Sequence, residues 1–357
     1  NGHPSLFDSL SNTYSKKYKN SSGKYSDFPV FRIPDYIFTQ LELLNFDELS
    51  QPIEVDNGYL LVYFYDYQKE FVPDIDNSWD LIYKYAKQKK QNIFFTNWVK
   101  NIKADYYVFI NTDVEVTSNW LNPLFNKMES NSNIGACQPK ILSEKNKNYF
   151  EYAGASGGYI DFLGYPYCRG RIFDTIEKDY GQYNEEKEVF WTSGSCMIIQ
   201  SSLFHKLNGF DKDFFAHMEE IDLCWRIKRK GFINYCIPKS VIYHIGGETL
   251  SYLNPKKTYL NFRNNLIMIS KNDRFINLLY KIPSRLILDI FAAIKILINK
   301  KSIFHFTSIL RAYLSFITFL PIIFFKKRNN KLNYINLKNL IIPFEYFIRG
   351  KKRFSDL

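Results

Sequence analysis

The chain has 357 residues, 46% of them hydrophobic and 18% aromatic, and a formal net charge of +11. This length suits one large domain with appendages or two modest ones, and the charge favours an anionic partner. The five cysteines are odd in number and include no Cys-x-x-Cys pair, which disfavours a disulfide framework and a zinc site and indicates a reducing compartment. Nucleic acid is disfavoured as a partner, because the basic residues gather around an apolar segment rather than alternating with stacking aromatics.

The first 101 residues give mixed signals. Residues 1–27 are rich in Ser, Asn, Lys, Tyr and Gly and indicate a poorly packed lead-in. They contain no signal-like apolar run, so we expect a cytoplasmic protein. Residues 59–65 predict a strand, and residues 78–90 predict an amphipathic helix.

From residue 104 the pattern becomes regular. Tyr106–Ile110 predicts a buried strand, Ser118 is expected to cap a helix over residues 119–130, and residues 134–142 predict a further strand. The Gly- and Tyr-rich residues 151–171 predict a structured loop. After it come a short buried strand, a capped short helix closed by Gly209, a longer helix and another strand, at residues 196–200, 201–208, 219–230 and 232–238. This alternation predicts an α/β fold with a mostly parallel sheet flanked by helices.

The composition changes after residue 273, and residues 300–353 are notably basic. Residues 303–325 are long enough to cross a bilayer, but Arg311 lies inside the segment and Pro321 interrupts it. We expect this segment to lie in the membrane interface, with the flanking lysines meeting anionic lipid. The alternative is a soluble helix packed on the core. Residues 273–357 are thus expected to form a basic amphipathic helical tail.

Polar side chains come almost directly after the strand Tyr106–Ile110: Asn111, Asp113 and Glu115. Ligands of open α/β sheets bind at the carboxyl ends of strands. The two carboxylates can converge on one divalent cation, and Mg²⁺ takes one or two carboxylates and completes its shell with water and substrate phosphates. His244, between a short strand and two glycines, can complete that shell. The structural alternative for Asp113 is a turn, in which its side chain bonds the backbone.

A second group of acids opens the helix expected at residues 219–230. Glu219, Glu220 and Asp222 stand where the helix dipole favours negative charge. The aromatic loop before them suggests a partly desolvated carboxylate, with a raised pKa suited to a general base. For Asp222 the alternative is an ion pair with Arg226, four residues further on.

Together these segments resemble the inverting GT-A glycosyltransferases of family 2, in particular their bacterial rhamnosyltransferase-like branch. The resemblance covers residues 102–272 and rests on an ordered series of motifs: ADYYVFINTDVEVTSNWL, GACQPKI, YAGASGGYID, FWTSGSCMIIQSSLF, FFAHMEEIDLCWRIKRKG and VIYHIGGETL. It implies a GT-A, Rossmann-like fold with its catalytic core at residues 102–272.

The resemblance also implies roles for single residues. Asp113 and Glu115 stand where the family holds the metal, Mg²⁺ or Mn²⁺, and the diphosphate of the sugar nucleotide. His244 matches a histidine that often assists the metal. Glu220 falls at the position of the catalytic base and Asp222 is the next acid of the same motif, so the choice between these two stays open.

Substrate contacts are implied in the same way. Asp56, in the segment IEVDNG, resembles the family's base- and ribose-binding element and is grouped with Asn111 and Asp113 as nucleotide-sugar-binding. Trp191 and Gly194 are expected to line the acceptor pocket, with core packing as the alternative for Trp191. The first half departs from the family, because its start suggests that the opening strand is missing and the residues around Asp56 match poorly. We therefore expect residues 1–101 to be a divergent or truncated N-terminal part of the nucleotide-binding half.

The sequence therefore predicts a metal-dependent enzyme that transfers a sugar with inversion from a nucleotide-sugar donor to a glycan or lipid-linked acceptor. A carboxylate would take the proton of the attacking hydroxyl, while the cation neutralises the diphosphate leaving group. The reaction would belong to cell-surface polysaccharide or glycolipid synthesis at the inner face of the cell membrane. The alternative is a catalytically impaired homologue, with a divergent or truncated first half, that acts as a membrane-associated binding or partner protein.

Overall fold

The computed structural model describes residues 35–55, 58–64, 103–246, 254–300, 302–328 and 339–357, with single residues elsewhere. The chain divides into two compact units, Asn1–Ile102 and Lys103–Leu357. The basic segment at residues 273–357 belongs to the same unit as residues 103–272. Asp56 lies outside the described residues, as does much of the helix expected at residues 78–90.

In the first unit the described residues include one helix and two small antiparallel strand pairs. The helix is α2 (Asp35–Leu41), and the strands are β1 (Glu48–Leu49), β2 (Ile53–Val55), β3 (Gly58–Leu60) and β4 (Tyr63–Phe64). β1 pairs with β4 and β2 with β3, both antiparallel. The prediction of a single strand at residues 59–65 is wrong, because the chain leaves the β2–β3 pair after Leu60 and Val62 bonds the Ser50 side chain through its backbone N–H.

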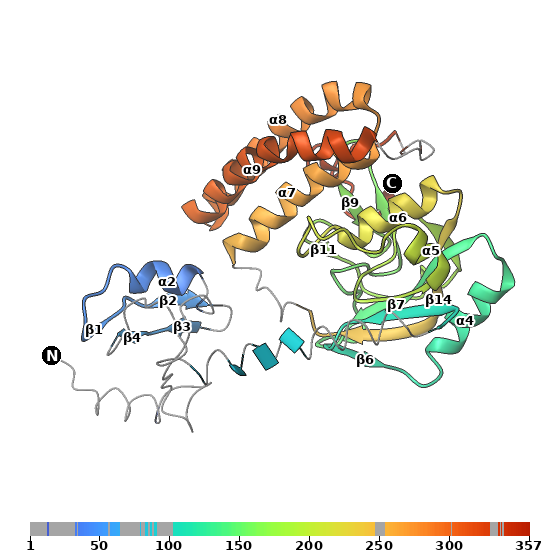
Figure 1. The fold of residues 1–357 in the computed structure, drawn as a ribbon, viewed down its shortest axis with the longest axis horizontal. Coiled ribbons are helices and arrows are strands. Elements are labelled where there is room, and N and C mark those ends of the chain that lie inside the picture. Colours follow the sequence, from blue (N-terminus) through green and yellow to red (C-terminus); the bar gives the residue numbers. More distant parts are fainter. Residues whose placement is uncertain are drawn as a thin grey trace. The chain divides into compact units, whose positions relative to one another are not determined.

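The second unit is built on a six-stranded mixed sheet (Figure 1). Its strands are β5 (Tyr106–Ile110), β6 (Val114–Val116), β7 (Ile134–Ser143), β12 (Lys187–Val189), β13 (Cys196–Gln200) and β14 (Ile233–His244). Their order is β12-β14-β7-β13-β5, and β6 pairs with β14. Within the described residues only β7 and β14 run parallel, and every other pair in this sheet is antiparallel. The mixed α/β class is confirmed, whereas the mostly parallel sheet is wrong.

The connection between β7 and β13 explains the difference. Parallel neighbours need a crossover connection, usually a helix. Residues 144–195, all of them described, hold no helix and instead form a second, four-stranded antiparallel sheet with β12 after it. That sheet consists of β8 (Gly158–Ile160), β9 (Pro166–Cys168), β10 (Arg171–Ile172) and β11 (Thr175–Ile176). The segment predicted as a structured loop, residues 151–171, is mostly buried and consists of turns with short strands between them, and β13 returns antiparallel to β7.

Three helices cover the mixed sheet: α4 (Leu121–Ser130), α5 (Ser201–Lys206) and α6 (Glu219–Arg229). Leu124 and Met128 of α4 pack on Ile134 of β7 and neighbouring core residues, at 0–1% exposure. The predicted cap of α4 is wrong, because Asn119 takes a left-handed turn (φ 60°) and moves the start of the helix to Leu121, without a side-chain cap.

The remaining helices gather at the other end of the unit: α7 (Pro255–Asn272), α8 (Phe275–Lys300), α9 (Ile303–Arg328) and α10 (Ile342–Phe347), with the short η2 (Phe354–Asp356) after them. α7, α8 and α9 lie alongside one another (Figure 1). Among the described residues, α9 is the one helix that is long and apolar enough, by length and composition, to cross a membrane, over Ile303–Ile323. The five cysteines are buried free thiols, in line with the expected absence of a disulfide framework.

Candidate active site

The end of β5 lies beside the start of β13. Ile110 pairs with Cys196, and the backbone N–H of Asn111 donates to the carbonyl oxygen of Ser195 at 3.0 Å. This antiparallel pairing places the exposed Asn111 next to the turn that contains Gly194. The predicted strand is confirmed, but it forms an edge of the described sheet, with Val108 at 37% and Ile110 at 42% exposure.

Asp113 and His244 meet at the far end of β14, as the sequence predicted. Oδ1 of Asp113 lies 3.2 Å from Nε2 of His244, and the backbone N–H of Ile245 donates to the Asp113 carbonyl at 3.1 Å. On the other side of the ring, Oε1 of Glu151 lies 3.4 Å from Nδ1 of His244. All three side chains are at most 10% exposed. The imidazole is therefore held between two buried carboxylates.

The electrostatics of this group suit a bound cation. Burial lowers the pKa of His244, but the carboxylates of Glu151 and Asp113 outweigh burial and the net pKa is raised. Both ring nitrogens are buried and neither has a hydrogen-bond partner with good geometry. A carboxylate oxygen beside an unpartnered imidazole nitrogen is a donor set that divalent metals accept. Asp113 and His244 therefore fit a cation that completes its shell with water and phosphate oxygens.

Glu115 does not join this group. Its side chain is 53% exposed and pairs with Nζ of Lys147 at 2.8 Å. In the β6–β14 register Glu115 is opposite Tyr243, whereas Val114 is opposite His244. Cross-strand partners share a face of the sheet and successive residues alternate, so Glu115 points away from the His244 face. The structure therefore does not bring Glu115 together with His244, and among the described residues no group of three or more His, Cys, Asp or Glu side chains could hold a metal ion.

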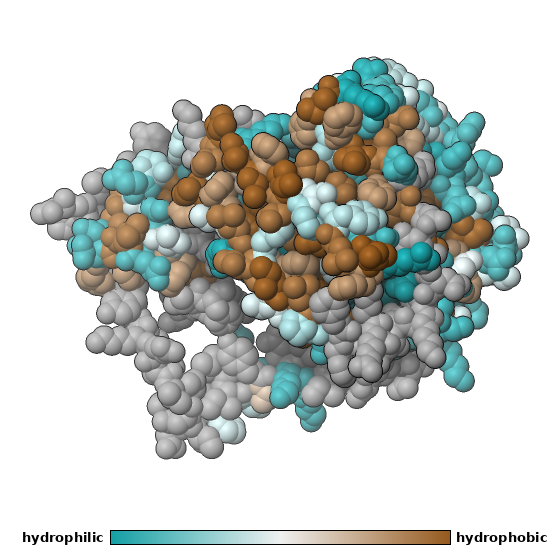
Figure 2. Space-filling model, turned by 90° about the horizontal axis from the view of Figure 1, so that it is seen from above, coloured by the Kyte–Doolittle hydropathy of each residue, from teal (hydrophilic) through white to brown (hydrophobic). Residues whose placement is uncertain are grey.

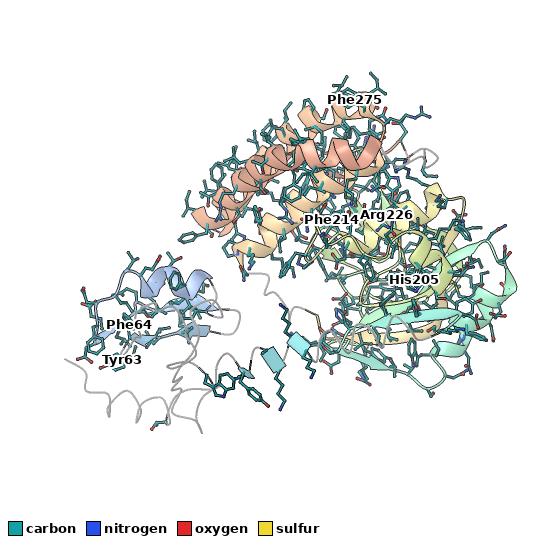
Figure 3. The ribbon with its side chains drawn as sticks, in the orientation of Figure 1. Tyr63, Phe64, His205, Phe214, Arg226 and Phe275 are labelled. Atoms are coloured by element: carbon teal, nitrogen blue, oxygen red, sulfur yellow. The ribbon has the colours of Figure 1, made fainter. Side chains whose placement is uncertain are left out.

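The loop before α6 is unusually strained. Phe215, His217 and Met218 have φ angles of 61°, 68° and 74°, although none of them is glycine. Such left-handed residues cost about 1 kcal/mol or more each and persist only where the surroundings hold them. α7 supplies that hold where the loop meets it (Figure 3), because Nδ2 of Asn264 donates at 2.7–2.9 Å to three loop carbonyl oxygens, those of Phe214, Ala216 and His217. These hydrogen bonds from Asn264 fix the conformation of the loop and so the direction in which α6 begins.

The helix so positioned presents Glu219 and Glu220. Oε2 of each is buried without a hydrogen-bond partner. Burial raises the pKa of Glu220 to about 8, and the negative charge of Glu219 contributes in the same direction. Gly194 faces this carboxyl group, since a Cβ on Gly194 would lie 3.6 Å from Cγ of Glu220. The predicted acceptor residue Gly194 is therefore in contact with the predicted base.

Asp222 has a different environment, in which both carboxylate oxygens are occupied. Oδ2 accepts from Nε of Arg226 at 2.8 Å and Oδ1 from Nδ2 of Asn272 at 2.7 Å, with Asp222 at 0% exposure. Arg226, labelled in Figure 3, also donates to the carbonyl oxygens of Leu207 and Gly209. Asp222 thus pairs with Arg226, as the ion-pair alternative predicted, and also links α6 to α7 through Asn272. This favours Glu220 as the base.

Trp191 lies in the core. It is 3% exposed, its Nε1 donates to the carbonyl oxygen of Tyr159 at 2.9 Å, and its ring fills the space beside Gly158. A ring buried in this way has no free face for a sugar, so the structure favours the core-packing alternative.

Two residues of the site were not found from the sequence. Glu151 is an isolated acid in a Gly- and Tyr-rich segment, and its only signal was its position after Phe150 in a buried stretch. Asn264 sits inside α7 with 0% exposure, where a polar residue needs buried partners. That signal could have marked Asn264, but it could not have named the loop that it holds.

No model of a known protein family matches the chain. The chain is 26% identical over 167 residues to N-acetylglucosaminyl-diphospho-decaprenol L-rhamnosyltransferase of Mycobacterium tuberculosis, covering 44% of this chain and 54% of that protein. It is 23% identical over 167 residues to a low-salt glycan biosynthesis hexosyltransferase of Haloferax volcanii, covering 46% and 51%. It is also 40% identical over 50 residues to rhamnosyltransferase WbbL of Escherichia coli, covering 14% and 19%.

Among solved structures, GalNAc-T7 with UDP, GalNAc and Mn²⁺ is similar at a TM-score of 0.34 and 14% identity, over 47% of this chain and 32% of that one. A TM-score this low does not establish a common fold. The chain spans about half the length of the Mycobacterium tuberculosis and Haloferax volcanii relatives. Over that shared region it is a distant homologue of rhamnosyltransferases and hexosyltransferases, which confirms the predicted resemblance.

Proposed function

We propose that the chain is a glycosyltransferase that moves a sugar, with inversion, from a nucleotide sugar to a glycan or lipid-linked acceptor of the cell envelope. One observation carries this proposal: Glu220 presents a carboxyl group with an unpartnered buried oxygen, a pKa raised to about 8 and a glycine opposite it. Homology to rhamnosyl- and hexosyltransferases supports the reaction class.

In the proposed reaction the ionised Glu220 carboxylate accepts the proton of an acceptor hydroxyl. The hydroxyl oxygen forms a bond to the anomeric carbon as the bond from that carbon to the diphosphate oxygen breaks. A single displacement inverts the configuration without a protein nucleophile. A pKa of about 8 makes Glu220 a stronger base than an ordinary carboxylate. Gly194 would leave room for the acceptor beside the base.

The donor would bind at the end of β5. Asp113 and His244 would hold a divalent cation, Mg²⁺ or Mn²⁺, while Glu151 keeps the His244 ring in place. When bound, such a cation neutralises charge on the diphosphate leaving group. Asn111, exposed beside the Gly194 turn, would contact the sugar nucleotide, and Asp56 remains a predicted contact to the base and ribose.

We place the enzyme in the cytoplasm, peripheral to the inner face of the cell membrane, where lipid-linked acceptors are found. α9 would lie in the interface rather than cross it, because a span over Ile303–Ile323 would bury Arg311 near its centre at a cost of about 2.5–3.5 kcal/mol. The flanking basic residues at 300–301 and 326–328 would meet anionic lipid.

The decisive experiment compares Glu220→Gln with Glu219→Gln, a matched change one residue earlier on the same helix. Glu220→Gln should abolish sugar transfer while leaving donor binding in place, and Glu219→Gln should retain transfer. Unchanged turnover in Glu220→Gln would remove it as the base. Failure of the wild type to bind any nucleotide sugar would point instead to the catalytically impaired homologue.

A further inference from the structure

The helix α8 buries charged side chains and exposes apolar ones, the reverse of an ordinary surface helix. In an ordinary surface helix the apolar stripe faces the core and the charged residues face water. On α8 the charged side chains Lys281, Arg285 and Asp289 are at most 2% exposed. The exposed stripe is apolar instead, with members at spacings of three and four residues: Ile276, Leu279, Tyr280, Leu286, Ile287, Ile290, Phe291, Ile294 and Ile298.

The inward-facing charged side chains of α8 form ion pairs within the protein. Nζ of Lys281 pairs with Asp273 at 2.6 Å, and Nη2 of Arg285 pairs with Asp289 at 3.2 Å. Asp289 also accepts from the Tyr165 hydroxyl at 2.6 Å and from the Tyr313 hydroxyl at 2.7 Å. This network fixes the rotation of the helix, so the apolar stripe cannot turn inward without breaking buried ion pairs.

The apolar surface continues onto neighbouring helices. Figure 2, which views the molecule from above, shows hydrophobic residues gathered across this part of the surface. α9 contributes exposed side chains along one side, namely Ile303, Phe304, Leu310, Leu314, Ile317 and Ile322, and α10 contributes Phe344 and Phe347. Among the described side chains of the exposed α8 stripe, one is charged: Lys295, whose Nζ lies over the Phe347 ring at 4.0 Å. Contiguous exposed apolar patches of this kind mark interaction sites.

The net charge around this apolar surface indicates which kind of partner binds it. Residues 273–357 contain 16 Lys and Arg against 4 Asp and Glu, a net +12, whereas residues 1–272 contain 31 against 32. The positive charge of the whole protein therefore lies in the part of the chain that carries the apolar surface. Two copies meeting through this surface would bring like charges together, whereas anionic lipid gains about 1 kcal/mol for each Lys or Arg near it.

We propose that the outward faces of α8 and α9 form one docking surface that lies flat in the interface of an anionic bilayer. The inference deepens the membrane contact of the proposed function by adding α8 and fixing which faces meet lipid. α9 is held to α7 by polar contacts, Thr258 to Nδ1 of His305 at 2.8 Å and the Tyr259 hydroxyl to Ser315 at 2.9 Å. These ties keep α9 on the protein, so the two helices rest on the membrane as a pair.

The test measures sedimentation of the full chain with phosphatidylcholine vesicles, with and without phosphatidylglycerol. Wild type should bind the anionic vesicles far better than the neutral ones. The double variant Ile287→Glu with Phe291→Glu, at 57% and 64% exposure on α8, should lower binding about tenfold or more, because two apolar side chains no longer enter the interface. Phe125→Glu, at 43% exposure on α4, is the matched control and should bind like wild type.

Equal binding by wild type and the α8 double variant would overturn the proposal. Loss of a dimer in the variant, with no vesicle binding by wild type, would assign the surface to a second copy. A lowered melting temperature without any change in vesicle binding would show that another part of the chain covers it. Donor binding is measured separately, without vesicles. Absent donor binding together with intact, α8-dependent vesicle binding would refute the proposed function and leave the docking surface standing.

Discussion

Glu220→Gln should make the fold more resistant to alkaline pH, because it removes a carboxyl group whose ionisation opposes folding. In the folded chain, burial and the charge of Glu219 raise the pKa of Glu220 from 4.5 to about 8. Between these values the unfolded chain has lost the proton and the folded chain keeps it. The folded state then binds more protons, so the free energy of unfolding falls as pH rises through this window and levels off above about pH 8.

The size of the effect depends on the two pKa values. One pKa unit corresponds to about 1.36 kcal/mol, so Glu220 should lower the free energy of unfolding by about 2 kcal/mol between roughly pH 6 and 8. This is an upper value, because the residue keeps partial contact with solvent. Glutamine cannot ionise, so the free energy of unfolding of Glu220→Gln should rise relative to that of wild type by about 2 kcal/mol between roughly pH 6 and 8.

Urea unfolding at the two pH values, at constant ionic strength, measures the difference directly. Glu185→Gln, a change at an exposed acid in the same unit, is the control and should behave like wild type at both. A difference between wild type and Glu220→Gln that stays constant with pH would refute the reasoning. Glu220 would then ionise like a surface acid, and the physical basis for its role as the base would be lost.

Three further changes test the neighbouring contacts. Asp222→Asn should destabilise the fold by about 3 kcal/mol, because the buried charge of Arg226 would lose its carboxylate partner, and a loss below about 1 kcal/mol in urea unfolding would contradict this. Asp113→Asn should abolish metal-dependent stabilisation by a donor in thermal-shift assays, whereas Glu115→Gln should retain it, and equal losses would restore Glu115 as a ligand. Gly246→Ala should lower the melting temperature, since its φ is +69° and a Cβ would lie 2.7 Å from the Glu151 carboxylate; an unchanged value would show that this carboxylate moves freely.

The sequence predicted the site where local rules decide the structure. His244 ends β14 and Asp113 lies in the turn between β5 and β6, so their meeting at one end of the sheet could be expected from strand boundaries and the family motif order. The i,i+4 spacing predicted the pairing of Asp222 with Arg226. These inferences need only the strand and helix periods and the identity of a few polar residues.

Register and long-range packing account for what the sequence missed. Glu115 lies apart from His244 because, in the β6–β14 pair, Val114 and not Glu115 is opposite His244. This register cannot be predicted from a local sequence pattern. The prediction of a mostly parallel sheet was wrong because the connection between β7 and β13 is a β-meander rather than a helix. Asn264 reaches a loop about 50 positions earlier in the chain, so its role depends on the packing of α7 against the α6 loop.

The most direct test of the central claim is a thermal-shift screen of the full chain with UDP-, dTDP- and GDP-sugars, with Mg²⁺ or Mn²⁺ and with excess chelator. We predict that one class of nucleotide sugar raises the melting temperature with metal present, and that chelator and Asp113→Asn both remove the effect. No stabilisation by any nucleotide sugar, or the same stabilisation in chelator, would contradict the account.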